Sequence, residues 1–262
     1  MSKKIILKGE RELELMRPAC AVAGAVLDEV SAFIKPGITT REVDEFAGAR
    51  MKYFGAKSAF LGYRKFPRQI CISVNEQVVH GLGGPRRLEF GDIVSLDIGV
   101  MHNGYVGDTA RTVAVGGCEV LAQRLMDVTE QSLYEGIAQA VAGKRVVDIS
   151  RAIQNYVEDN GFSVVREFVG HGVGRTVHEE PQVPNFVEND KASPVLGPGM
   201  TLAIEPMVNT GSPAVTQLND GWTVVTKDGQ LSAHFEHTVL VTEGEPEILT
   251  WPTKTPSKQR VG

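Results

Sequence analysis

The chain has 262 residues, of which 42% are hydrophobic and 23% are charged, as is usual for a soluble globular protein. Its 27 basic and 32 acidic residues give a net charge of −5, which argues against the basic face of a general nucleic-acid binder. The longest small-apolar stretch, 19–27, is far shorter than the roughly 20 residues of a membrane span.

Three widely spaced cysteines match neither a disulfide framework nor a zinc site, which favours a reducing compartment. The first residues contain too few consecutive apolar side chains for a signal peptide. These features predict a cytoplasmic protein with a single domain over 1–262. Its polar, proline-bearing tail, 252–262, is expected to be loose.

The chain consists of two halves, roughly 10–115 and 116–250, whose patterns follow the same order. Helical patterns over 10–34 and 120–141 open the halves. A second helical pattern follows in each half, bracketed by two glycines that lie 18 positions apart: Gly37 with Gly55, and Gly143 with Gly161. Because glycine is the common residue just after a helix, each half is expected to begin with two helices.

Each half then has a histidine beside glycines and an apolar run that leads to an acid. His80 stands in Val-His-Gly-Leu-Gly, and His171 stands in Gly-His-Gly-Val-Gly. The apolar run of the first half starts at Gly91 and ends six positions later at Asp97. The run of the second half starts at Gly199 and ends six positions later at Glu205. Four matches in one order predict an α+β chain of two related halves, which bring acids and histidines to one centre.

Asp97 and Asp108 flank a predicted hairpin whose turn is Asn103-Gly104. Asp97 ends the first strand pattern and Asp108 lies on the returning strand, so the two are expected to be near cross-strand neighbours. Taken singly, each aspartate reads as a turn or surface residue. Asp97, however, lies in an apolar run, where an unpaired charge is costly unless a cation or a proton compensates it.

Two more acids and one histidine complete the candidate site. Glu205 ends the strand pattern Leu-Ala-Ile-Glu-Pro, Glu236 enters another strand, and His171 is expected in a turn between glycines. Four carboxylates and one imidazole suit a pair of divalent ions such as Mn²⁺, Fe²⁺, Co²⁺ or Zn²⁺. Such a pair activates water for hydrolysis. The sequence contains no Gly-x-Ser-x-Gly motif and no phosphate loop that would favour other chemistry.

The other histidines divide into two groups. His178 follows His171 by seven positions, so it is either a ligand or a hydrogen-bonding or proton-transfer group just outside the ligand set. His80 holds the place in the first half that His171 holds in the second. The remaining histidines are predicted to be structural or surface residues: His102, His234 and His237.

Together, these motifs resemble the type I methionine aminopeptidases in their short bacterial form, over about residues 10–250. The resemblance implies the pita-bread fold, whose pseudo-twofold symmetry agrees with the repeat. The motifs that carry it are Cys71-Ile-Ser-Val-Asn, Val79-His80-Gly, Gly91-Asp-Ile-Val with Asp97, Gly107-Asp108-Thr, Gly170-His171-Gly-Val-Gly-Arg, His178-Glu-Glu-Pro, Gly199-Met-Thr, Ile204-Glu205-Pro-Met and Glu236-His-Thr.

The resemblance also implies roles and partners. Glu205 would accept a proton from water, His178 would hydrogen-bond the scissile amide region, and His80 would contact the substrate backbone or leaving group. Substrates would be the N-termini of nascent polypeptides with a small second residue, cut by a cytoplasmic monomer, with the ribosome as a candidate partner. Two divalent ions (Co²⁺, Mn²⁺, Fe²⁺ or Zn²⁺) would be held by Asp97, Asp108, His171, Glu205 and Glu236, with Asp108 and Glu236 bridging them.

The expected methionine pocket departs from the family pattern. Its positions match the family at Tyr63, Cys71 and Trp222. Phe60, Phe66 and Val177 stand where the best-known bacterial members have Cys, Tyr and Phe. Because one position gains a ring and another loses one, the volume is roughly kept. Neutral drift with packing compensation is one interpretation, and an altered tolerance for methionine analogues is the other.

Two alternative functions remain. A proline-specific peptidase of the same fold would use the same kinds of ligand. Such enzymes usually carry an additional N-terminal domain, whereas here the first helix is expected by about residue 10, with no zinc-binding extension before it. A binding module that has lost catalysis would be expected to lack metal ligands, but all five are present.

Overall fold

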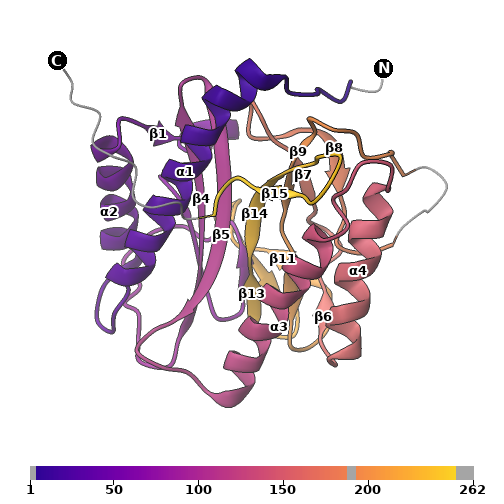
Figure 1. Ribbon diagram of the computed structural model, residues 1–262. Helices are drawn as coiled ribbons and strands as arrows, with labels where there is room; N and C mark the ends of the chain where they lie inside the picture. Colours follow the sequence, from indigo (N-terminus) through magenta and orange to yellow (C-terminus); the bar gives the residue numbers. More distant parts are fainter. Residues whose placement is uncertain (1–3, 188–192, 252–262) are drawn as a thin grey trace.

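The computed structural model describes residues 4–187 and 193–251 (Figure 1). The tail predicted to be loose, 252–262, lies outside the described residues. Within the two described ranges, no helix combines the length and the apolar character needed to cross a membrane.

Each half begins with two helices, as the glycine pattern predicts. They are α1 (Glu10–Phe33) and α2 (Thr40–Tyr53) in the first half, and α3 (Val120–Ile137) and α4 (Val146–Asp159) in the second. The expected ranges 10–34 and 120–141 therefore run slightly past the helix ends. The four bracketing glycines all have positive φ, between 71° and 87°, which is the left-handed conformation that side chains disfavour.

The strands form one large antiparallel sheet and two small ones. The main path of the large sheet runs β1 (Lys57–Ser58), β4 (Ile93–His102), β5 (Tyr105–Ala114), β14 (Glu236–Leu240), β9 (Thr201–Ile204), β7 (Gly170–Gly172) and β8 (Glu179–Val183). In addition, β2 (Cys71–Val74) pairs with β4, and β15 (Glu247–Ile248) pairs with β14. One small sheet has the strand order β13 (Ser232–His234), β10 (Met207–Asn209), β6 (Ser163–Val164). The other has the order β11 (Val215–Gln217), β12 (Val224–Thr226), β3 (Gln77–Val79).

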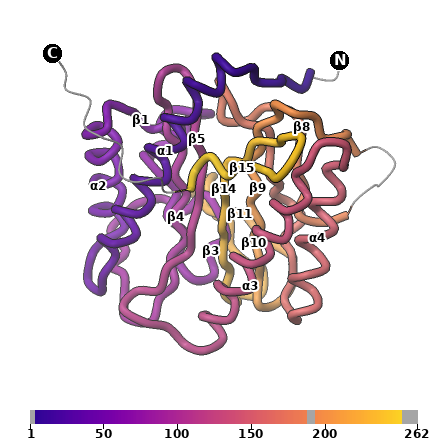
Figure 2. The backbone as a smooth tube through the Cα atoms, viewed as in Figure 1, coloured from indigo at the N-terminus to yellow at the C-terminus, as the bar shows by residue number. Residues whose placement is uncertain are grey.

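The two halves meet where β5 pairs with β14 in the middle of the large sheet. In Figures 1 and 2, α1 and α2 lie with β4 and β5 on one side of the molecule, while α3 and α4 lie with β9 on the other. Each half has its own apolar core, one including Val26 of α1 and Ile98 of β4, the other including Leu125 of α3 and Leu202 of β9. This is the α+β arrangement of two similar halves that the repeat predicts.

The hairpin between β4 and β5 confirms one local prediction and corrects another. Its turn is Asn103-Gly104, with φ values of 50° and 79°, as expected for an Asn-Gly turn. Asp97 was predicted to end its strand, but β4 continues to His102. The reason is that Ile98 and Val100 carry the apolar pattern onward, and both are fully buried.

His171 was expected in a turn, and this prediction is also wrong. It lies in strand β7, which is paired with β8 on one side and β9 on the other. The flanking glycines permit close strand packing rather than a turn. A Cβ atom at Gly170 would lie 2.4 Å from the Ala203 carbonyl oxygen, and one at Gly172 would lie 2.3 Å from that of Glu180.

Candidate active site

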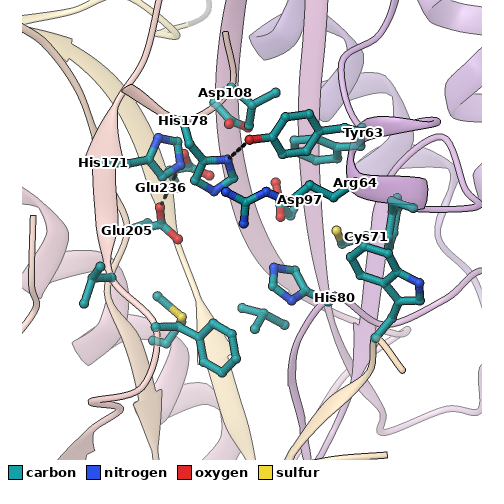
Figure 3. Close-up of a pocket in the computed structure, with 18 residues that line it drawn as sticks. Tyr63, Arg64, Cys71, His80, Asp97, Asp108, His171, His178, Glu205 and Glu236 are labelled. Carbon is teal, nitrogen blue, oxygen red and sulfur yellow. Dashed lines mark hydrogen bonds and ion pairs between the residues drawn. The ribbon is translucent and has the colours of Figure 1, made fainter. Parts of the chain in front are cut away.

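A cavity of about 220 Å³ is lined by residues of both halves, and all thirteen residues predicted for the site line it (Figure 3). The five predicted ligands come from neighbouring strands: Asp97 from β4, Asp108 from β5, Glu236 from β14, Glu205 just after β9, and His171 from β7. The sheet therefore gathers acids that are far apart in the sequence.

The register of the sheet explains how close the acids lie. Asp97 is paired with Ala110, and Ala110 is paired with Glu236, so these three residues occupy one row across three strands. Asp108 pairs with Gly99, two positions along β4 from Asp97. Asp97 and Asp108 are thus diagonal rather than direct neighbours, which agrees with the expectation of near neighbours.

Asp108 and Glu236 are buried, Asp97 and Glu205 are largely buried, and three of their carboxylate oxygens lack a donor within the described ranges. Asp97 Oδ1, Asp108 Oδ1 and Glu236 Oε1 have no hydrogen-bond partner among the described residues. Burial raises the pKa of Asp97 to about 7 and those of Asp108, Glu205 and Glu236 well above the ordinary value. Ligand atoms of Asp108, His171 and Glu236 lie within 4.8 Å of one another. Unpaired buried carboxylates are costly, so this donor set fits divalent cations.

His171 presents the nitrogen that such a cation needs. Its Nδ1 lies 2.9 Å from the carbonyl oxygen of Gly172, and a neutral ring therefore donates the Nδ1 proton there. Burial lowers the pKa of His171 to about 4, which keeps the ring neutral at pH 7. Nε2 is left with its lone pair, 3.3 Å from Glu205 Oε1. This backbone contact is a typical support for a metal-binding histidine.

His178 and His80 border the cavity at different places (Figure 3). The ring centroid of His178 lies 4.2 Å from that of His171, and its Nδ1 is 3.0 Å from the Tyr63 hydroxyl. The ring of His80 meets Phe168 edge-on, with centroids 5.4 Å apart. Burial lowers the pKa to about 3 for His178 and about 4 for His80, so both rings are neutral at pH 7.

The apolar part of the cavity contains the six residues expected for the methionine pocket. They are Phe60, Tyr63, Phe66, Cys71, Val177 and Trp222. The ring of Phe66 meets those of Phe60 and Trp222 edge-on, at 6.4 Å and 5.1 Å. Phe60 fits because Gly99 has no side chain: a Cβ atom there would lie 2.3 Å from the Phe60 ring. Gly99 therefore provides the space for the ring that distinguishes this pocket from the family pattern.

Sequence reasoning missed several residues. Arg64, Val79, Phe168, Val169 and Met207 also line the cavity. Val79 and Met207 belong to recognised motifs, and Phe168 and Val169 directly precede one, yet in sequence they look like ordinary core positions. Arg64 has a φ of 48°, and the sequence contains no signal that predicts this left-handed backbone conformation.

Three histidines were predicted to be structural or surface residues, and none of them lines the cavity in the described chain. His102 and His237 have partners outside the cavity, the Gly55 carbonyl at 3.3 Å and the Thr250 hydroxyl at 2.9 Å. His234 is buried, with its Nε2 only 3.7 Å from Glu205 Oε2. A histidine in a short apolar strand gave no sign of this neighbour.

Comparison with known proteins agrees with this geometry. Residues 14–243 match the model of metallopeptidase family M24. The chain is 52% identical to the methionine aminopeptidase of Clostridium perfringens, covering 94% of this chain and 98% of that protein. It is also 52% identical to methionine aminopeptidase 1 of Bacillus subtilis, covering 94% and 99%.

Solved structures agree as well. The methionine aminopeptidase of Thermotoga maritima superposes with a TM-score of 0.92 at 44% identity, covering 94% of this chain and 99% of that one. The prolidase of Pyrococcus furiosus superposes with a TM-score of 0.77 at 24% identity, covering 95% and 66%, and shares the fold alone. The chain has the pita-bread fold and a buried Asp/His/Glu cluster suited to divalent metal. It belongs to the methionine aminopeptidases of metallopeptidase family M24.

Proposed function

We propose that this metal-dependent aminopeptidase removes N-terminal methionine with two divalent ions, held by Asp97, Asp108, His171, Glu205 and Glu236. The observation that carries the proposal is the set of buried carboxylates on neighbouring strands, three of whose oxygens lack any hydrogen-bond donor in the described chain. Asp108 and Glu236 lie on paired strands in the middle of the set, which suits bridging carboxylates. The donors suit Mn²⁺, Fe²⁺, Co²⁺ and Zn²⁺ alike.

Ions bound there would supply a water of lowered pKa and would polarise the carbonyl of the scissile bond. Glu205 is the proposed proton acceptor. Its carboxylate is buried, and burial raises its pKa well above the ordinary value. Bound cations would offset this rise and keep the carboxylate ionised, which is the state that can accept a proton. Glu205 would accept the proton at one carboxylate oxygen and pass it to the leaving amine.

His178 is the proposed hydrogen-bond donor to the scissile amide region. A neutral ring whose Nδ1 accepts from the Tyr63 hydroxyl carries its own proton on Nε2, where it can be donated. His80 lies on another side of the cavity, next to Phe168 and Trp222. It is proposed to contact the substrate backbone or the leaving group.

The two ends of the cavity would set the specificity. The apolar end, with the rings of Phe60, Phe66 and Trp222, would take the methionine side chain. The free amine of the substrate would lie at the acidic end, so only the first residue can be removed. A small second residue is proposed to be preferred, with the histidines and Arg64 lining the rest of the cavity.

We further infer that the chain acts as a single catalytic domain and a cytoplasmic monomer. Its protein substrates would be the N-termini of nascent polypeptides, and the ribosome is a candidate docking partner. The name of the Clostridium relative and the metallopeptidase family support the protein substrate.

The test is hydrolysis of Met-Gly-Met-Met beside Ala-Pro and Gly-Pro peptides by metal-stripped protein, with and without Co²⁺ or Mn²⁺. Metal-dependent release of methionine alone is the expected result. Cleavage before proline would assign the chain to proline-specific activity. Absence of turnover with every metal, despite metal binding, would indicate a binding module.

A further inference from the structure

Glu205 has an imidazole on each side of its carboxylate. His171 Nε2 lies 3.3 Å from Oε1, and His234 Nε2 lies 3.7 Å from Oε2. The first of these nitrogens has a lone pair, because its ring donates Nδ1–H to the backbone. The two oxygens of Glu205 therefore face different chemical environments.

The Nε2 atom of His234 is buried and has no hydrogen-bond partner among the described residues. Only 2% of the His234 side chain and 13% of the Glu205 side chain are exposed. With divalent ions bound, Glu205 is ionised, and its Oε2 would attract an N–H on His234 Nε2 but repel a lone pair there. The stable tautomer next to Glu205 therefore carries its proton on Nε2. The 3.7 Å separation is about half an ångström longer than a hydrogen bond, so the inference requires this contact to tighten by that amount.

The backbone around His234 is fixed on both sides. Its N–H donates to the Thr112 hydroxyl at 2.9 Å, and that hydroxyl lies 3.0 Å from the His234 carbonyl oxygen, which ties β13 to β5. On the other side, His234 pairs with Met207 of β10, two residues after Glu205. The distance between His234 and Glu205 is thus set by sheet pairing rather than by a mobile loop.

We infer that His234 is a positioning residue whose Nε2–H holds Oε2 of Glu205, so that Oε1 stays turned toward His171. It acts through Glu205 and does not itself touch the substrate. The inference rests on the role proposed above for Glu205. Such outer partners of metal ligands typically affect metal affinity by about 10- to 100-fold.

The experiment measures Mn²⁺ affinity of the metal-stripped protein by calorimetry, in His234→Met and His234→Gln. Methionine has similar length but no donor, whereas the glutamine amide can donate to Oε2. We expect His234→Met to weaken Mn²⁺ binding about tenfold or more, and His234→Gln to stay within about threefold of the wild type. In saturating Mn²⁺, His234→Met should lower kcat with little change in KM.

Two controls separate positioning from general damage. In a Glu205→Ala background, His234→Met should cause no further loss of Mn²⁺ affinity, because the residue it acts through is gone. His237→Met removes another buried imidazole, one bonded to Thr250, and should leave Mn²⁺ affinity unchanged. If His234→Met does not fold, His234→Asn takes its place and is compared with His234→Gln. The asparagine amide is too short to reach Oε2 of Glu205.

Wild-type Mn²⁺ affinity in His234→Met, or a loss of equal size in the Glu205→Ala background, would overturn the inference. Failure of the proposed function has a different signature. In that case the wild-type protein would release no methionine with any metal, while the binding cycle would still report whether His234 acts through Glu205.

Discussion

The Tyr63 hydroxyl lies 3.0 Å from Nδ1 of His178, with the two rings nearly parallel at 9° and their centroids 5.5 Å apart. The residues are 115 positions apart in the chain and come from different halves. When the hydroxyl donates to Nδ1, the His178 proton lies on Nε2, as the proposed role of His178 requires. A residue of the proposed methionine pocket thus contacts a group proposed to act at the scissile bond.

Tyr63→Phe tests this coupling. The ring and its stacking stay, but the donor to Nδ1 is lost, so both tautomers of His178 become accessible. We expect kcat/KM for Met-Gly-Met-Met to fall about three- to tenfold, the value of one hydrogen bond, with unchanged thermal stability. An activity equal to that of the wild type would show that the tautomer is set by another group.

Glu205→Gln tests the proposed proton acceptor. The amide keeps the size of the side chain but cannot take up a proton, and it is a weaker ligand. We expect kcat to fall by about 10²- to 10⁴-fold while the protein remains folded, as judged by circular dichroism. Near wild-type turnover in a metal-saturated assay would exclude Glu205 as the base.

Much of the fold could be predicted because its signals are local. The glycines at 37 and 143 precede helices, and those at 55 and 161 follow them. Because the same order of motifs occurs twice along the chain, it implied two halves. The ligands were predictable for a related reason, since an acid such as Asp97 within an apolar run is costly unless it has a partner.

What could not be predicted depends on contacts between distant segments. The space that Gly99 leaves for Phe60 exists only once β4 lies beside the loop that carries Phe60. The position of His234 next to Glu205 depends on the pairing of β10 with β13. The prediction at Asp97 was wrong for a related reason. Its charge was taken as the end of the strand, although the apolar pattern continues beyond it.

Gly99→Ala tests the packing beneath the pocket. An added methyl group would meet the rigid Phe60 ring, so we expect a loss of about 1–3 kcal/mol in the free energy of unfolding. The same substitution in a Phe60→Cys background should cost clearly less, because the smaller side chain leaves room. Equal losses in both backgrounds, measured by urea unfolding, would mean that another neighbour causes the strain.

Phe60→Cys combined with Val177→Phe tests whether the pocket has a changed specificity. The pair moves one ring across the pocket and keeps its volume roughly constant. If the present shape selects substrates, the ratio of kcat/KM for methionine over norleucine peptides should change by at least about threefold. An unchanged ratio would support neutral drift.

The metal-free protein should lose stability as the pH rises from about 6.5 to 8.5. Asp108, Glu205 and Glu236, whose pKa burial raises well above the ordinary value, keep their proton in the folded state after the unfolded chain has released it, so unfolding becomes easier at higher pH. Asp97, with a pKa of about 7, adds to this decline only up to about pH 7. The buried histidines oppose this mainly below about pH 7.5, because above it they are neutral in both the folded and the unfolded state. Each such carboxyl contributes at most about 1.4 kcal/mol per pH unit.

Saturating Mn²⁺ should abolish this decline, because bound cations stabilise the ionised carboxylates and their protons are no longer needed. Thermal unfolding at several pH values, with chelator or with Mn²⁺, measures the difference, which should widen toward pH 8.5. Asp108→Asn provides the matched control, since it removes one raised carboxyl and should flatten the metal-free curve. A metal-free stability that stays constant or rises between pH 6.5 and 8.5 would show that the acids are already ionised and compensated by groups of the protein itself.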